Sequence, residues 1–195
     1  MAPPRRTRPA AAPPRGWIVR RPWLTAGILL AIAVAIAIWL AVGRASPSSS
    51  VLVLAPAPDY AGHPAIDNVQ CQNTEQVAYH IHQHLAIFVN GQPRGVPEGI
   101  GIAPPRQIQN TTNGPFVVGG ACFYWLHVHD RTGVIHVESP SEQAFTLGTF
   151  FDVWQQPLSA SQAGPASGPV IAYVNGQRFQ GDPRQIPLTA HDITR

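Results

Sequence analysis

Residues 79–91 of this 195-residue chain read YHIHQHLAIFVNG. Histidines occupy every second position from 80 to 84, whereas the positions between and after them are mainly apolar. Because successive side chains of a strand point to opposite faces, this alternation predicts a β-strand over residues 79–89 with imidazoles on one face. Asn90 and Gly91 tolerate positive φ, so a tight turn and a return strand are expected next.

A second hairpin that carries histidines is predicted over residues 122–139, CFYWLHVHDRTGVIHVES. Its two β-rich segments are residues 122–129 and 133–139, joined by a short polar connection. A connection of even length allows two registers between these segments. His129 lies opposite His136 in one register, and His127 lies opposite His136 in the other. Both registers put the same four side chains on one face: His127, His129, His136 and Glu138.

The rest of this region is predicted to contain one short helix and one further strand. Thr146 is expected to cap a helix whose apolar stripe consists of Leu147, Phe150, Phe151 and Trp154. A strand is expected over residues 170–174, and the segments 103–120 and 159–168 are expected to be loops. The predicted fold class is α+β, mainly β: a small antiparallel β-rich domain with one short helix.

An apolar run precedes this domain. Residues 23–42, WLTAGILLAIAVAIAIWLAV, contain no charge, and twenty helical residues span a hydrocarbon core of about 30 Å. A single transmembrane helix is therefore expected over residues 23–43. Six arginines precede it and Arg44 alone follows closely, which predicts a cytoplasmic N-terminus and an extracytoplasmic C-terminal domain. The alternative is a secretory signal cleaved near Gly43-Arg44-Ala45, which would also export the domain.

The chain is thus expected to have four parts: a disordered cytoplasmic tail (1–22), the transmembrane helix (23–43), a Ser/Pro-rich linker (44–68) and a β-rich domain containing the histidines (69–195). The lipid bilayer is the expected partner of residues 23–43. From Ala45 onward, six arginines stand against ten Asp and Glu residues, a formal charge of −4. A domain of this charge is a poor binder of phosphate, so no nucleic-acid partner is expected.

The chain has two cysteines, Cys71 and Cys122. In an oxidising compartment outside the cytoplasm, their pairing in a disulfide is the expected state. Two free thiols, or thiolate ligands close to the histidines, are the alternative.

Five of the eight histidines form two tight groups, and this clustering indicates a metal site. Residues two apart on a strand point to the same face about 6.5–7 Å apart, so each His-x-His pair can offer two imidazoles to one ion. Asp130 is a candidate to orient an imidazole by accepting its N–H. The predicted ligands are His127, His129, His136, Glu138, His80, His82 and His84.

Imidazoles with a carboxylate suit zinc or copper best, and also iron or nickel, whereas calcium and magnesium prefer shells of oxygen. A methionine-based copper(I) site is excluded because the only methionine is Met1. The favoured hypothesis is a module that holds or transfers zinc or copper outside the cytoplasmic membrane. The alternatives are a metal-dependent enzyme of the cell envelope, with Glu138 or Asp130 as a base, and an interaction domain without metal whose histidines respond to pH.

Four stretches carry a resemblance to known sequences: HIHQHLAIFVNG, YWLHVHDRTGVIHVESP, FTLGTFFDVW and YVNGQRFQGDP. Through their motifs HxHxHL and YWLHxHDxxGVIHxE, the chain resembles an uncharacterised family of exported or membrane-anchored bacterial proteins. The resemblance covers most of residues 71–192. It implies a single domain that contains both histidine groups, and it implies no particular activity.

Overall fold

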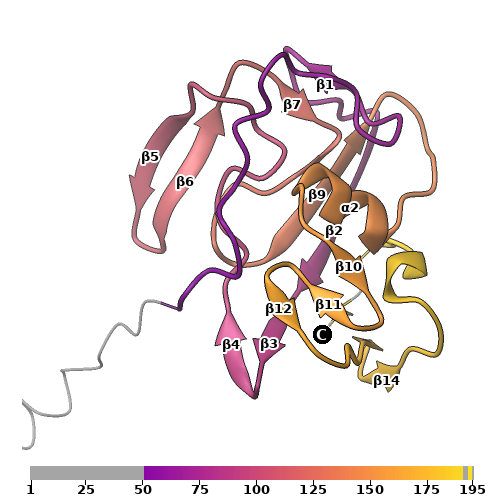
Figure 1. The fold of residues 1–195 in the computed structure, drawn as a ribbon. Helices are drawn as coiled ribbons and strands as arrows, with labels where there is room; N and C mark the ends of the chain where they lie inside the picture. The colour runs from indigo at the N-terminus through magenta and orange to yellow at the C-terminus, as the bar shows by residue number, and fades with distance from the viewer. Residues whose placement is uncertain (1–50, 191–192, 195) are drawn as a thin grey trace, which may run out of the picture. The chain divides into compact units, whose positions relative to one another are not determined.

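A computed structural model describes residues 51–190, 193 and 194 of the chain (Figure 1). The predicted cytoplasmic tail, the predicted transmembrane helix and the first part of the predicted linker lie outside these residues. Within the described residues, no helix is both long enough and apolar enough to cross a bilayer. The description below concerns the folded unit to which these residues belong.

The regular elements of this unit are mainly short strands, together with one α-helix and one 3₁₀ turn. They are, in chain order, β1 (Cys71–Gln72), β2 (Tyr79–Leu85), β3 (Ile87–Val89), β4 (Gln92–Arg94), β5 (Gln107–Thr111), β6 (Gly114–Gly119), β7 (Phe123–Tyr124), β8 (Leu126–His127), β9 (Val134–Ser139), α2 (Leu147–Val153), β10 (Leu158–Ser159), β11 (Gln162–Ala163), β12 (Ala166–Ser167), β13 (Tyr173–Val174), β14 (Gln177–Arg178), η1 (Pro183–Gln185) and β15 (Ile193–Thr194). The prediction of a mainly β domain with one short helix is confirmed.

The largest sheet has six strands in the order β14-β13-β15-β2-β9-β8. β2 and β9 form its longest pair and lie side by side in the centre of Figure 1. All neighbours are antiparallel except β15 and β2, which are parallel. The histidine-bearing strands β2, β9 and β8 are therefore consecutive in one sheet, although residues 86–125 separate β2 from β8 in sequence.

One face of this sheet belongs to the hydrophobic core. Leu126, Ile135 and Val137 on β8 and β9 are completely buried, as the alternation of the sequence requires. Gln83, the one polar residue predicted among the apolar positions of β2, is also buried, and its side-chain amide donates to Oγ1 of Thr194 at 2.6 Å. The opposite face carries the imidazoles.

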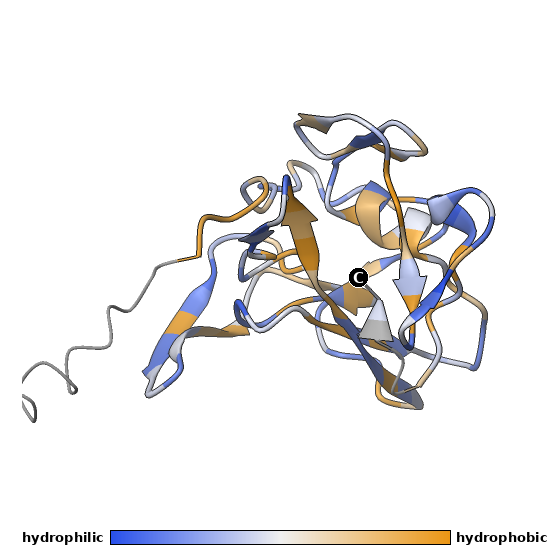
Figure 2. Ribbon diagram, turned by 90° about the horizontal axis from the view of Figure 1, so that it is seen from below, coloured by the Kyte–Doolittle hydropathy of each residue, from blue (hydrophilic) through white to orange (hydrophobic). Residues whose placement is uncertain are grey.

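The helix α2 was predicted correctly, with Thr146 as its N-cap. The Thr146 side chain accepts a hydrogen bond from the backbone N–H of Thr149 at 3.3 Å. Phe150, Phe151 and Trp154 are buried in the core, and Figure 2 colours most of the helix as hydrophobic. This stripe is structural, as expected from its spacing.

Both Asn-Gly pairs form tight hairpin turns. Asn90 and Gly91 have φ values of 51° and 74° between β3 and β4, and Asn175 and Gly176 have values of 50° and 78° between β13 and β14. Two successive residues at positive φ are typical of the type I′ turn, which matches the twist of the flanking strands. The predicted hairpin after residue 89 is confirmed.

Two segments predicted as loops contain strands. Residues 103–120 include the hairpin β5–β6, and residues 159–168 include β11 and β12 of a small three-stranded sheet with β10. Every residue of β5 is exposed, so this strand has no buried face and shows no apolar alternation in the sequence. A strand without a buried face leaves only turn-forming residues as a signal, and such residues also indicate loops.

The folded part begins earlier than the predicted end of the linker at residue 68. Leu54, Ala55 and Tyr60 are buried in the core. The Tyr60 hydroxyl donates to the carbonyl oxygen of Val153 at 2.9 Å and accepts from the backbone N–H of Gly101 at 2.6 Å. The Pro-rich composition suggested a spacer, but the apolar residues within it pack against the domain, so this boundary was wrong.

Candidate metal centre

The sheet brings the predicted ligands together through its register. On the imidazole face, His80 lies opposite Glu138 and His82 lies opposite His136, which is on β9. On the other side of β9, His127 of β8 also lies opposite His136. Directly opposed residues of neighbouring strands point to the same face with Cβ atoms about 4.5–5.5 Å apart. Three strands thus deliver their side chains to one small region.

The second of the two registers predicted for the 122–139 hairpin is the one observed, with His127 opposite His136. His129 lies beyond the end of β8, yet its ring remains beside His136, with ring centroids 4.6 Å apart. The predicted sharing of one face by this hairpin's histidines is confirmed.

Four ligand atoms form what we call the outer set: Nε2 of His80, Nε2 of His82, Nδ1 of His136 and Oε1 of Glu138. Nε2 of His82 lies 3.0 Å from Nε2 of His80 and 3.1 Å from Nδ1 of His136. Oε1 of Glu138 lies 3.0 Å from Nε2 of His80 and 3.2 Å from Nδ1 of His136. The four atoms therefore form a ring in which each atom is 3.0–3.2 Å from the next.

A second group, the inner set, contains Nε2 of His127, Nε2 of His129, Oε2 of Glu138 and Oε1 of Glu75. Oε1 of Glu75 lies 3.9 Å from Nε2 of His127 and 3.4 Å from Nε2 of His129. Oε2 of Glu138 lies 3.8 Å from Nε2 of His127. For bonds of 2.0–2.1 Å, two ligands of a tetrahedral ion are about 3.3 Å apart. The neighbouring donors of the outer set are close to this spacing, and those of the inner set, at 3.4–3.9 Å, are wider.

Backbone carbonyl groups orient the two inner imidazoles. Nδ1 of His127 is 2.9 Å from the carbonyl oxygen of Tyr124, and Nδ1 of His129 is 2.6 Å from that of Val117. Because a carbonyl oxygen only accepts, both Nδ1 atoms carry a proton, and the lone pair of each neutral ring is on Nε2. A backbone carbonyl that fixes the tautomer of a metal-binding histidine is a recurrent feature of metal sites.

Two atoms of the inner set are buried and unsatisfied. Among the described residues, Nε2 of His127 and Oε2 of Glu138 have no hydrogen-bond partner. The side chains of His127 and Glu138 are 0% and 3% exposed. Leaving a buried polar atom unpaired costs roughly 1–3 kcal/mol, and more for a charged group. Two such atoms 3.8 Å apart are consistent with a site whose partner is a cation.

The environment keeps His127 and Glu138 in the protonation states that metal binding needs. Burial, with the neighbouring His129, lowers the pKa of His127 to about 3, so its imidazole is neutral at pH 7. Burial alone would raise the pKa of Glu138, but its hydrogen bond with His136 and the nearby imidazoles outweigh that effect and lower the pKa. A neutral imidazole and an ionised carboxylate are the forms that coordinate a metal.

His84 and Asp130 lie outside both sets. Nε2 of His84 is 2.8 Å from the carbonyl oxygen of Thr132, which lies in the connection between β8 and β9. The imidazole of His84 is therefore engaged in this hydrogen bond. Oδ1 of Asp130 accepts from the backbone N–H and the hydroxyl of Thr132. The alternation of β2 places His84 on the same face as His80 and His82. However, the residue opposite it on β9 is Val134, which cannot bind a metal. These two predicted roles therefore have no counterpart in the geometry.

Glu75 is the member of the site that the sequence did not reveal. It precedes β2 in the segment between β1 and β2, and its side chain is 37% exposed. Because it is not part of a strand, the alternation of strand faces does not predict where its side chain points. A carboxylate five residues before a His-x-His-x-His strand is a weak signal, because loop geometry decides where such a side chain points.

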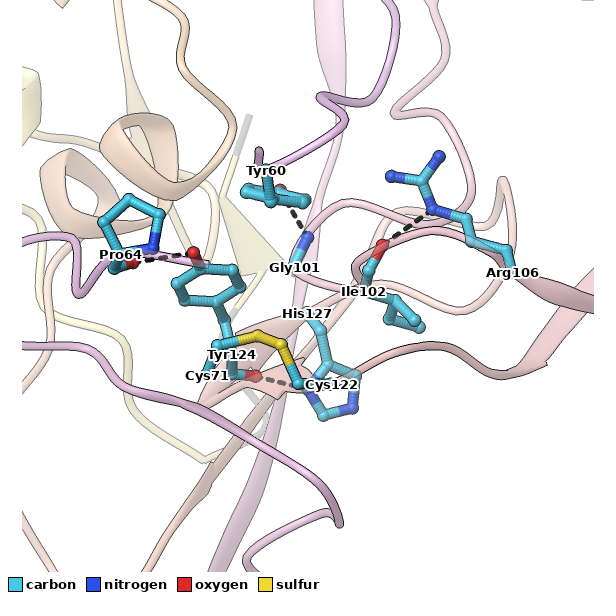
Figure 3. The surroundings of a disulfide bond; sticks show 9 residues. All are labelled: Tyr60, Pro64, Cys71, Gly101, Ile102, Arg106, Cys122, Tyr124 and His127. Carbon is cyan, nitrogen blue, oxygen red and sulfur yellow. Dashed lines mark hydrogen bonds between the residues drawn. A yellow bond between two sulfur atoms is a disulfide. The ribbon is translucent and has the colours of Figure 1, made fainter. Parts of the chain in front are cut away.

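The predicted disulfide between Cys71 and Cys122 is present, and it borders the site (Figure 3). It lies where β1 pairs with β7, with Cys71 opposite Tyr124. Tyr124 contributes the carbonyl oxygen that holds His127, as Figure 3 shows. The bridge therefore ties the segment leading to Glu75 to the segment leading to His127.

Gly101 allows a close approach behind His127. It has a φ of 73°, and a Cβ atom at this position would lie 2.1 Å from the carbonyl oxygen of Leu126 and 2.7 Å from Cβ of His127. Both contacts are far closer than atoms tolerate, so only glycine fits here.

The site contains imidazole and carboxylate groups and no thiol, because both cysteines are in the disulfide. Among the described residues, three groups have donor atoms close enough to share an ion: His80 with His82 and His136, His127 with His129 and His136, and Glu75 with His127 and Glu138. These groups are able to hold a transition-metal ion. Comparisons with protein-family models, with curated proteins and with solved structures find no match to this chain.

Proposed function

We propose that this protein is a membrane-anchored, extracytoplasmic domain that binds a transition-metal ion, zinc or copper(II), at the inner set. The observation that carries the proposal is the buried pair formed by Nε2 of His127 and Oε2 of Glu138, neither of which has a hydrogen-bond partner among the described residues. Nitrogen and oxygen donors in this combination suit zinc and copper(II), and also iron or nickel, but not calcium or magnesium.

Two features support the location. The uncharged stretch at residues 23–42, with arginines concentrated before it, has the length and charge asymmetry of a signal anchor. The disulfide between Cys71 and Cys122 fits an oxidising compartment, since such bonds are rare in the cytoplasm. The proposed topology has the N-terminus inside and the histidine domain outside.

Metal analysis of the purified full-length chain tests the proposal. After equilibration with zinc or copper(II) and removal of free metal, we expect at least one ion per chain. The double variant His127→Ala, His129→Ala should lose one ion, because affinity at the inner set should fall by more than the roughly 10–100-fold that loss of a second-shell partner causes.

The matched control is His84→Ala. It removes an imidazole from the same sheet face, but one engaged by the Thr132 carbonyl, and should leave the metal content unchanged. Equal metal content in the wild-type chain and in the double variant would reject the inner set as the site.

A further inference from the structure

We infer that the centre holds two transition-metal ions, one at each set, bridged by the carboxylate of Glu138. The inference rests on the proposed function and extends it, because the inner set alone accounts for one ion. Both ions are of the same chemical class, divalent zinc or copper.

The number of donors is the first reason. Zinc in proteins is almost always four-coordinate, yet seven side chains converge here. A single ion would leave at least three of them without a ligand role. The seven are His80, His82, His127, His129, His136, Glu75 and Glu138.

The geometry of the outer set is the second reason. Its four successive donor-to-donor distances are 3.0, 3.1, 3.2 and 3.0 Å. Ligands bound at about 2.0–2.1 Å lie about 2.9 Å apart in a square arrangement and about 3.3 Å apart in a tetrahedral one. The observed values fall between these limits, so each neighbouring pair of donors in the outer set is spaced as two ligands of one ion are. The three imidazole donors also all lie within 4.8 Å of one another.

The orientation of Glu138 is the third reason. Its Oε1 faces His80 and His136 of the outer set, whereas its Oε2 faces His127 of the inner set. One carboxylate with an oxygen toward each set can bind two ions, which in two-metal sites lie about 3.5–4 Å apart. The carboxylates of Glu138 and Glu75 also offset part of the repulsion between two dications.

The two sets differ in access to solvent. The side chain of His80 is 36% exposed, whereas those of His127 and His129 are 0% and 8% exposed. An ion at the outer set is therefore the one expected to exchange with solution first, and substitutions there should leave the core undisturbed.

Calorimetric titration of the metal-free full-length chain with zinc chloride, checked by metal analysis, tests the inference. We expect two ions per chain in the wild type and in His84→Ala. His80→Ala with His82→Ala should leave one ion, and His127→Ala with His129→Ala should leave the other. Glu138→Gln, which keeps the shape of the side chain, should weaken both ions and serves if the variant of the buried histidines does not fold.

A wild-type chain that binds one ion overturns the inference. If the His80, His82 double variant keeps that ion and the His127, His129 double variant loses it, the proposed function stands; the opposite pattern overturns the proposed function as well. A chain that binds no zinc or copper overturns both proposals. Loss of both ions in each double variant would also contradict two separable positions.

Discussion

Saturating zinc is expected to raise the midpoint of thermal unfolding of the histidine domain by about 10 °C. A ligand that binds only the folded state at about 1,000 times its Kd stabilises it by roughly 4 kcal/mol. In a domain of this size each kcal/mol corresponds to a few degrees. The physical source of the effect is the buried pair of His127 and Glu138, whose unpaired atoms are a cost that coordination removes.

Circular dichroism of the full-length chain, recorded on heating with and without zinc, measures this shift. Magnesium at the same concentration is the control for general effects of a divalent cation, since it prefers octahedral oxygen ligands and should leave the midpoint unchanged. Zinc is chosen because it has no redox chemistry. An equal zinc-induced shift in the His127→Ala, His129→Ala variant would show that the stabilising site lies elsewhere.

Removing the disulfide is the second change with a large expected effect. The double variant Cys71→Ser, Cys122→Ser opens a loop between residues separated by 51 positions. On the loop-entropy model, this lowers the free energy of unfolding by about 4 kcal/mol. Metal affinity should fall as well, because the bridge borders the segments that carry Glu75 and His127.

Urea unfolding of the wild-type and double-serine chains, both without metal, measures the stability difference. Reduction of the wild-type chain with a dithiol is the matched control and should reproduce the result for the double variant. An unchanged unfolding midpoint would mean that the β1–β7 pairing and the core hold this region without the bridge.

The face on which the imidazoles lie was predictable from the sequence. Alternation in residues 79–85 and in residues 134–139 required strands with histidines on one side and core residues such as Ile135 and Val137 on the other. The helix cap at Thr146 and the two Asn-Gly turns were predictable for a similar reason, since the signal for each lies within a few residues.

The meeting of the two histidine groups was not predictable, because it depends on pairing between distant segments. His82 and His136 are 54 positions apart, and no local pattern sets the register of β2 against β9. The same holds for His129, whose ring stacks on Phe116 and whose Nδ1–H donates to Val117 in a hairpin predicted as a loop. Glu75 lies in a connecting segment, where residue type alone does not indicate direction.

The central claim is that the inner imidazoles coordinate a transition-metal ion, and anomalous diffraction at the zinc absorption edge tests it most directly. Crystals of the zinc-loaded chain should show an anomalous peak about 2.0–2.1 Å from Nε2 of both His127 and His129. A peak confined to surface histidines such as His63 or His84, or no peak at all, would contradict the account.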